Sequence, residues 1–231
     1  MIYMTCMGAL VVLQWLMVKA VLTLPIFGYK CDTKTKLKDE SVLARQQKET
    51  LRLFVFLGSG GHTGEMLRLL QNYEKTLLAA KNEIYVGYSD DASLAAFQRL
   101  EKKFSDVKVS YIRFGKAREV GSSKLQSLVS IARTLLQSIQ SLTWLKYQFL
   151  GQSHLVLLNG PGTCCVISYW LKLLEILTCT RSKILYVESL ARTDSLSLTG
   201  KLLYPIVDEF VVQWEELHTH YERSKCFGIL V

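Results

Sequence analysis

The sequence has few of the residues that mark disordered, repetitive or disulfide-rich proteins. Of its 231 residues, 3 are proline and 14 are glycine, whereas 49% are hydrophobic. A chain with this much apolar side chain buries a core, so the disordered, collagen-like and low-complexity classes are excluded. The length is that of one ordinary domain with an appendage.

Cysteine pairs with metal-binding spacing are also lacking. The chain contains 6 cysteines, too few for a disulfide scaffold, and none of them forms a Cys-x-x-Cys pair. The residues that follow Asn72, Asn82 and Asn159 form no N-glycosylation acceptor. We therefore expect a reducing compartment, no metal site and no cofactor.

Acidic side chains are outnumbered by basic ones. The chain has 28 Lys and Arg against 20 Asp and Glu, a net charge of +8. This excess predicts an anionic partner, and the charge alone does not choose among a phosphate, a nucleic acid and an acidic membrane surface.

The first 18 residues carry no charged side chain. As a helix they would reach about 27 Å, close to the thickness of a bilayer core, and Lys19 could extend its ammonium to the headgroups. A cleaved signal peptide is the alternative, but no basic residue precedes Lys19, whereas basic residues recur between Lys30 and Lys48. We expect residues 1–29 to be an uncleaved transmembrane anchor, residues 30–50 a basic linker, and the body, residues 51–231, to be cytosolic.

From Leu51 onward, short β-rich runs alternate with helical patterns, which indicates an α/β fold with a parallel sheet and helices on both faces. The expected strands span residues 51–57, 84–88, 107–114, 154–158, 183–187 and 210–213.

A long amphipathic stretch lies between the third and fourth expected strands. Its apolar residues recur at steps of three and four from Leu125 to Phe149, which is typical of a helix with one apolar stripe. We expect the stripe to pack against the sheet. The alternative places the helix on a membrane surface, with Lys124, Arg133, Trp144 and Lys146 at the lipid boundary.

A glycine-rich loop follows the first expected strand and leads into a helix. Its residues are Gly58, Ser59, Gly60, Gly61, His62, Thr63, Gly64 and Glu65. Ligands of open parallel sheets bind beyond the carboxyl ends of the strands, and glycines with free N–H groups at a helix start favour a phosphate. The loop is neither a P-loop nor Gly-x-Gly-x-x-Gly, because no Gly-Lys-Ser/Thr follows and Thr63 occupies the third glycine position. A Gly-x-Gly-x-x-x-Gly variant remains open.

Two side chains of this loop are candidates for chemistry. Histidine is a common general base in catalysis, so His62 could accept a proton from an attacking hydroxyl, or it could brace the loop by a hydrogen bond. Glu65 would repel a phosphate, so it either bonds a sugar hydroxyl or is a helix-start charge.

Polar residues also follow three other expected strands. A second glycine turn contains Asn159, Gly160, Gly162 and Thr163, and Thr163 suits the cap of a helix through Val166 to Cys179. Glu188 ends the fifth strand, where apolar neighbours would raise its pKa, or it pairs with Arg192. The third strand leads into a basic loop with Arg113, Lys116, Arg118 and Glu119, able to meet a diphosphate or simply solvated.

Together these motifs resemble the asparagine-linked glycosylation "fourteen" family, the membrane-anchor subunit of the dolichol-pathway UDP-N-acetylglucosamine transferase. The matching runs are Gly58-Ser-Gly-Gly-His-Thr-Gly-Glu65, Arg118-Glu-Val120, Asn159-Gly-Pro-Gly-Thr-Cys164, Tyr186-Val-Glu-Ser189, Leu196-Ser-Leu-Thr-Gly-Lys201 and Val211-Val-Gln-Trp214. Each run alone is weak, but six in this order are specific. The sequence departs from the expected pattern at residues 114–116 and at Cys165.

The resemblance implies a Rossmann-like half of a GT-B glycosyltransferase, similar to the acceptor-binding half of the bacterial enzyme that glycosylates undecaprenyl-diphospho-muramyl peptide. The donor half would be a separate catalytic chain, and the pair would transfer N-acetylglucosamine from its UDP donor onto N-acetylglucosaminyl-diphospho-dolichol, with inversion, at the cytosolic face of the endoplasmic reticulum membrane.

The resemblance also assigns site residues. The loop over residues 58–65 would hold the acceptor diphosphate or sugar, with His62 or Glu65 touching the attacking 4-hydroxyl and with Asn159, Gly160 and Glu188 lining the cleft. The predicted acceptor-binding set also includes Arg118, Glu119, Gly162 and Thr163.

The C-terminal residues are apolar where a chain usually frays into water. The resemblance makes Phe227, Ile229, Leu230 and Val231 a docking segment for the catalytic subunit. The alternative is a last strand on the protein's own sheet.

Two other functions stay open. A nicotinamide-dependent oxidoreductase would use the glycine loop, with Asp90 or Asp91 holding a ribose. A pure membrane scaffold would tether a partner and contribute no site residue.

Overall fold

The computed structural model describes residues 2–28, 50–104, 107–115, 124–178 and 180–231. Their strands form one parallel sheet in the order β3-β2-β1-β4-β5-β6-β7. The strands are β1 (Arg52–Leu57), β2 (Glu83–Tyr88), β3 (Lys108–Arg113), β4 (His154–Asn159), β5 (Lys183–Val187), β6 (Glu209–Val212) and β7 (Ser224–Cys226). The six predicted strands are confirmed to within one residue at each end, and β7 is additional.

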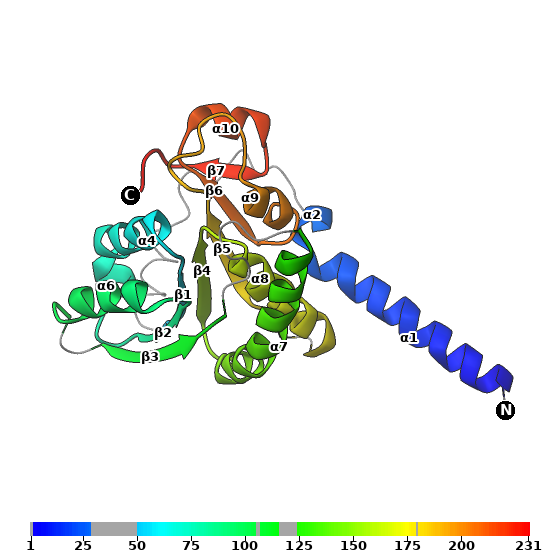
Figure 1. The fold of residues 1–231 in the computed structure, drawn as a ribbon. Helices are drawn as coiled ribbons and strands as arrows, with labels where there is room; N and C mark the ends of the chain where they lie inside the picture. Colours follow the sequence, from blue (N-terminus) through cyan, green and yellow to red (C-terminus); the bar gives the residue numbers. More distant parts are fainter. Residues whose placement is uncertain (1, 29–49, 105–106, 116–123, 179) are drawn as a thin grey trace.

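Helices cover both faces of this sheet, as the alternating pattern predicted (Figure 1). One face carries α4 (Gly61–Asn72), α5 (Glu74–Leu77) and α6 (Asp91–Glu101), and the other carries α7 (Lys124–Gln148), α8 (Thr163–Thr178) and α9 (Leu198–Leu203). The short α10 (Glu215–His220) connects β6 to β7.

Strand β1 shows why the sheet is buried on both sides. Its alternate side chains Leu53 and Val55 belong to the core under α4 and α6, whereas Phe54 and Phe56 belong to the core under α7 and α8. A strand with helices on both faces needs a continuous apolar run rather than an alternating one. The uninterrupted apolar sequence from Leu53 to Leu57 meets this need.

The amphipathic stretch is the helix α7. Leu142, Leu145 and Phe149 are buried against the sheet, so the expected core packing is confirmed for this part of the helix. Leu136 is an exception, since its side chain is exposed.

The alternative of a lipid boundary along α7 is wrong for Lys146. Its side chain is buried, and its ammonium donates to the Thr180 carbonyl at 2.5 Å and to Ser182 Oγ at 2.6 Å. The lysine enters the protein because two oxygen acceptors lie there. The side chains of Lys124 and Arg133 lie outside those that the structure describes.

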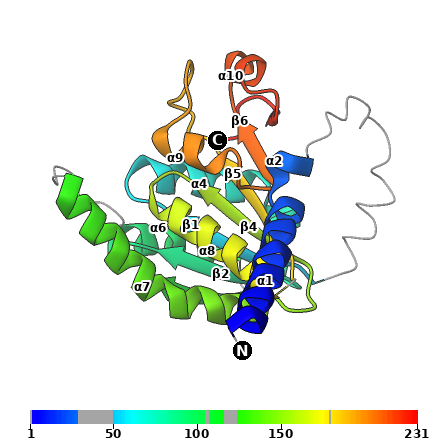
Figure 2. The same ribbon diagram turned by 90° about the vertical axis from the view of Figure 1, so that its right-hand side faces the viewer.

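The N-terminal helix α1 (Ile2–Thr23) projects away from the body, and the short α2 (Pro25–Gly28) joins it to the domain (Figures 1 and 2). Helix α1 contacts α8. Across the residues that the structure describes, no helix combines the length and apolar character needed to cross a bilayer. The predicted basic linker, residues 30–50, falls almost entirely outside the described ranges.

The C-terminal residues are partly a strand of the protein's own sheet. Residues Ser224–Cys226 form β7, which pairs with β6 at the edge, and the predicted docking residues Phe227, Ile229, Leu230 and Val231 follow this strand. Beyond β7, Phe227 and Ile229 are exposed, whereas Leu230 and Val231 pack partly on the core under α4.

Candidate functional site

The order of the strands creates a crevice between β1 and β4. The connections that leave these two neighbours run to opposite faces of the sheet, so their carboxyl ends are the switch point at which ligands of open α/β sheets bind. The two glycine turns follow β1 and β4. The sheet order therefore brings together two motifs that lie about a hundred residues apart in the sequence.

The two turns touch each other closely enough to require glycine. Gly160 has a φ of 101°, and a Cβ at this position would overlap the imidazole of His62. A Cβ at Gly58 would lie 2.7 Å from Cδ of Pro161 and 2.9 Å from Cβ of His62. His62 is thus held between the first turn, to which it belongs, and the second turn, over which it lies.

His62 has a nitrogen that lacks a hydrogen-bond partner. Its Nδ1 atom is buried, and no donor or acceptor of the described residues reaches it. Buried polar atoms are nearly always paired in folded proteins, so this atom has capacity left for a ligand. The alternative of a loop-bracing hydrogen bond finds no partner for Nδ1 in the described part of the chain.

Glu65 and Asn159 form a network across three elements. Oε2 of Glu65 accepts from Nδ2 of Asn159 at 2.9 Å, and Oε1 accepts from Oγ of Ser189 at 2.7 Å. Nδ2 of Asn159 also donates to the Val187 carbonyl at 3.1 Å. The network ties α4 to the ends of β4 and β5, so both carboxylate oxygens of Glu65 are engaged.

Asn159 leaves its amide oxygen free within the described residues. This Oδ1 atom is buried and has no partner there, while Nδ2 is held by two acceptors. The amide is therefore fixed in one orientation, with an acceptor available for a hydroxyl or N–H of a ligand.

Glu188 is more deeply buried than the other acidic candidate. Its Oε1 accepts from the Ser189 N–H at 3.1 Å, and its Oε2 accepts from the N–H and Oγ of Ser197 at 3.2 and 3.1 Å. Burial raises the pKa of Glu188, whereas these bonds and the charge of Arg192 act in the opposite direction. The carboxylate faces the start of α9, where Gly200 abuts it, and holds the loop between β5 and α9.

Thr63 holds the first glycine turn in place through hydrogen bonds. It is buried, and its Oγ1 donates to the Gly58 carbonyl and lies 2.7 Å from Oγ of Ser93. Ser93 Oγ also donates to the Gly58 carbonyl at 2.8 Å. The neighbouring Ser59, Gly60, Gly61 and Gly64 are exposed, so the backbone at the start of α4 faces outward.

The remaining predicted residues divide between the site and its surroundings. Thr163 is buried and is the first residue of α8, rather than a cap before Val166, and Gly162 is exposed beside it. Arg118 and Glu119 lie outside the described residues. Oδ1 of Asp90 caps α6 by accepting from the Ser93 N–H at 2.8 Å, whereas its buried Oδ2 has no hydrogen-bond partner among the described residues. Asp91, the other aspartate of the oxidoreductase alternative, lies 3.8 Å from Arg113.

The sequence did not single out three residues that support the site. Ser189 holds Glu65, and the Tyr186 hydroxyl donates to the Gly160 carbonyl at 3.3 Å. Nε2 of Gln213 donates to the Glu188 carbonyl at 3.0 Å, and its Oε1 accepts from the Leu230 N–H at 3.1 Å. A signal was present for Ser189 and Gln213, because each is a polar residue at the carboxyl end of a buried strand.

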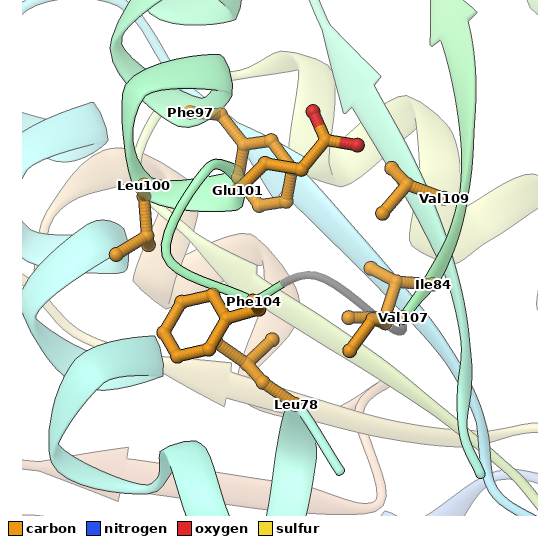
Figure 3. Close-up of a pocket in the computed structure, with 8 residues that line it drawn as sticks. All are labelled: Leu78, Ile84, Phe97, Leu100, Glu101, Phe104, Val107 and Val109. Atoms are coloured by element: carbon orange, nitrogen blue, oxygen red, sulfur yellow. The ribbon is translucent and has the colours of Figure 1, made fainter. Parts of the chain in front are cut away.

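Two cavities lie away from this crevice. Between α6 and the strands β2 and β3, Figure 3 shows an apolar pocket in which the carboxylate of Glu101 points away from Leu78 and Phe104. Its volume of about 10 Å³ admits at most one water. A groove of about 210 Å³ lies on the α4 face of the sheet, lined by Leu69, Tyr73, Thr76, Leu77, Leu155, Leu157, Leu185, Val187, Val211, Phe227 and Leu230.

The chain matches the family model "Oligosaccharide biosynthesis protein Alg14 like" over residues 53–230. It is 50% identical over 220 residues to the UDP-N-acetylglucosamine transferase subunit ALG14 of Saccharomyces cerevisiae, covering 93% of this chain and 92% of that relative. The protein of the same name from Kluyveromyces lactis is 48% identical over 221 residues, covering 94% and 93%. The crystal structure of Acinetobacter baumannii MurG has a TM-score of 0.44 at 14% identity, and the similarity covers 71% of this chain and 41% of that one.

Proposed function

This chain belongs to the Alg14-like family of oligosaccharide biosynthesis proteins, and from that premise we propose that it is the membrane-anchoring, acceptor-binding subunit of a two-chain UDP-N-acetylglucosamine transferase. The proposed reaction adds the second N-acetylglucosamine to N-acetylglucosaminyl-diphospho-dolichol on the cytosolic face of the endoplasmic reticulum. The donor-binding catalytic subunit is a separate chain.

One observation carries this proposal. Two buried atoms, Nδ1 of His62 and Oδ1 of Asn159, lack partners in the described residues and belong to the two glycine turns at the switch point of the sheet. A sugar presents hydroxyl groups that can donate to both atoms once a shift of the two turns uncovers them, because both atoms are buried. The open backbone at the start of α4 offers N–H groups and a positive helix end to a diphosphate.

The residues of the cleft have distinct roles in the proposed transfer. The 4-hydroxyl oxygen of the acceptor attacks C1 of the donor sugar, the bond from C1 to the UDP oxygen breaks, and UDP leaves with the electron pair. His62 takes the proton of the attacking hydroxyl. Glu65 acts as a positioning residue, because Asn159 and Ser189 occupy its carboxylate, and Glu188 positions the loop that ends at Ser197.

The proposed partner docks on the C-terminal segment. Phe227 and Ile229 are 67% and 60% exposed, although hydrogen bonds from Asn72 to the Leu230 carbonyl and from the Leu230 N–H to Gln213 hold the tail on the sheet. The apolar groove next to Phe227 and Leu230 extends this surface. Exposed apolar side chains on an ordered segment are typical of an interaction site.

The proposed anchor is α1. Most of its described side chains are apolar, and many of them are exposed, including Leu10, Val12, Met17 and Leu22. A helix that is apolar all round is stable only inside a protein core or a membrane, and no core surrounds this one in the described structure.

A transfer assay tests the acceptor role. The chain is combined with its donor-binding partner, UDP-N-acetylglucosamine and a short dolichol-like acceptor, and the chain alone is assayed in parallel. We expect turnover only from the pair, and we expect His62→Ala to lower kcat by about 10²-fold or more while the partner still co-purifies.

His220→Ala is the matched control, because His220 is an exposed histidine on α10. Wild-type rates in the His62→Ala pair would favour the pure scaffold, and turnover by the single chain would contradict a separate donor-binding subunit.

A second experiment tests the docking segment. The double variant Phe227→Ser and Ile229→Ser removes two exposed side chains without touching Leu230, so we expect the fold to persist and the partner to be lost from pull-downs. Lys225→Ser, an exposed neighbour in β7, is the control. Partner binding that survives the double variant would place the interface elsewhere.

A further inference from the structure

Helix α8 has an inverted distribution of charge. Its two charged side chains, Lys172 and Glu175, are 2% and 5% exposed and point inward, where Lys172 Nζ lies 3.0 Å from Glu175 Oε2 and 3.0 Å from Asp208 Oδ2. Its outward stripe is apolar instead. Surface helices normally show the opposite arrangement, with charges toward water.

The outward stripe of α8 continues onto α9. Tyr169, Leu173 and Leu177 are spaced by four residues and are 44%, 42% and 53% exposed, and Leu198 and Leu202 of α9 are 72% and 45% exposed. The Tyr169 hydroxyl donates to the Leu202 carbonyl at 3.2 Å, so the two stripes lie side by side. These five residues form what we call the α8–α9 face.

The helix α1 leaves the body on the same side of the sheet as the α8–α9 face. Figure 2 looks onto this side, with α8 between α7 and α1 and with α9 beside it, and α1 contacts α8. On α1, the ammonium of Lys19 lies 5.6 Å from the ring centre of Trp15. Tryptophan and lysine together are typical of the membrane–water boundary of an apolar helix.

The exposed charged residues of α9 and of the segment directly after α8 are basic. Arg181 and Lys183 follow α8, Lys201 belongs to α9, and all three are exposed. Neither α8 nor α9 has an exposed acidic residue. This combination of an apolar surface and neighbouring cations fits the anionic cytosolic leaflet of a bilayer better than it fits water.

We infer that the α8–α9 face rests on the lipid headgroup boundary beside α1, so that the body is held on the membrane at two places and in one orientation. This inference rests on the proposed anchoring by α1. Because α8 begins at Thr163, in the turn that contacts His62, a helix lying on the membrane fixes the height of the cleft above the lipid. The diphosphate of a lipid-linked acceptor would then meet the cleft without a large movement of the body.

Site-specific photocrosslinking of the full chain tests this placement. p-Benzoylphenylalanine is introduced singly at Leu173, Leu177 and Leu202, at Leu13 of α1 as the anchor control, and at Gln98 as the exposed control on α6. Each protein is reconstituted in vesicles of phosphatidylcholine and phosphatidylinositol that contain an alkyne-tagged lipid. We expect lipid adducts at the three face positions within about threefold of Leu13, and at least about tenfold fewer at Gln98.

The crosslinking positions distinguish lipid contact of the α8–α9 face from anchoring by α1. Adducts at Leu13 without adducts at the face would overturn this inference and leave the anchor standing. Adducts at the face without adducts at Leu13 would support contact of the face with lipid, but they would contradict the anchor and overturn the attachment at two places. Adducts at neither would contradict both, and adducts of the face with a protein partner in place of lipid would also overturn the inference.

A transfer assay of variants with acidic residues on the α8–α9 face tests the same placement. The double variant Leu173→Asp and Leu177→Asp should lower transfer to a long-chain acceptor in vesicles by about tenfold and leave transfer to a short-chain acceptor in detergent unchanged. Ala95→Asp with Gln98→Asp adds the same charge to the exposed side of α6 as the control. Equal rates for the parent and the α8 variant in vesicles would contradict the inference.

Discussion

The two ends of the parallel sheet both contain polar side chains, but they use them differently. At the amino ends of β5 and β6, the ammonium of Lys172 lies 3.0 Å from oxygens of both Glu175 and Asp208, and Asp208 also accepts from the Ile184 N–H at 2.9 Å. At the carboxyl ends of β1 and β4, His62 and Asn159 each keep one buried atom without a partner in the described residues.

This difference distinguishes buried polar groups that stabilise the fold from buried polar groups that are available to a ligand. A buried charge with its full set of partners holds elements in place and has no capacity left for a ligand. A buried polar atom without a partner weakens the fold, so its presence beside two glycine turns indicates that something else completes it. The amino end therefore fastens α8 to the sheet, and the carboxyl end is where we propose that the acceptor binds.

The largest effect on stability is expected from removing the buried ion pairs at the amino ends of β5 and β6. Lys172→Met removes the buried ammonium that lies 3.0 Å from both Glu175 and Asp208, so we expect a loss of about 3–5 kcal/mol in the free energy of unfolding. Chemical unfolding of the detergent-solubilised chain measures it. Arg181→Met is the matched control, because the Arg181 side chain is 74% exposed and its ion pairs with the same acids are long, and we expect a change below about 1 kcal/mol. Similar losses of unfolding free energy in Lys172→Met and Arg181→Met would contradict the claim that the buried ion pairs of Lys172 stabilise this end of the sheet.

A smaller effect on stability, with a large one on transfer, is expected at the carboxyl end. In Gly160→Ala, the new methyl group overlaps His62 and the residue keeps a φ of 101°, so we expect a loss of about 1–3 kcal/mol in unfolding free energy and a displaced imidazole. The transfer assay should show a fall of about 10²-fold in kcat/KM.

Gly64→Ala provides the stability control for this variant. A Cβ at Gly64 meets nothing within 4 Å, and the position is helical, so we expect the variant to be more stable by about 0.5–1 kcal/mol. Loss of stability at Gly64 equal to that at Gly160 would show that the contact between the turns is not what requires glycine.

The smallest expected effect is a pH dependence. Burial raises the pKa of Glu188 above its usual 4.5, so the folded chain holds this proton at a higher pH than the unfolded chain does. Its contribution to stability is present below pH 4.5 and is lost as the pH rises through the folded pKa. Relative to the parent, Glu188→Gln should therefore gain stability over this interval, as measured by urea unfolding at several pH values.

Glu83 offers the opposite control. Its hydrogen bond with Lys108 and the neighbouring charges hold its pKa below the usual value despite some desolvation. Its contribution is therefore present above pH 4.5 and is lost as the pH falls through the folded pKa. The stability of each variant relative to the parent should change with pH in opposite directions for Glu83→Gln and Glu188→Gln. A change in the same direction would contradict the two assigned pKa shifts.

The elements were predictable because their patterns are local. The apolar run of β1 and the glycines after it are contiguous in the sequence, and no long-range information is needed to recognise a strand followed by a turn. The short β7 escaped prediction because Ser224–Cys226 has no apolar run and becomes a strand by pairing with β6. Its structure depends on its neighbour.

The partners within the site were less predictable. That His62 and Asn159 belong to one crevice follows from the strand order, but that Glu65 bonds Asn159 and Ser189 depends on how α4 docks on the sheet. The hydrogen bonds of Glu188 with Ser197 were also not predictable from the sequence. Side-chain direction at a strand end depends on the loop that follows, and that loop has no periodic signal.

The position of Gln213 links the C-terminal tail to the rim of the cleft. One end of its amide holds the Glu188 carbonyl, and the other end holds the Leu230 N–H. A displacement of the tail therefore either breaks the bond to Leu230 or moves the backbone at Glu188. In this fold, a partner that displaced the tail without breaking this bond would also change the shape of the cleft.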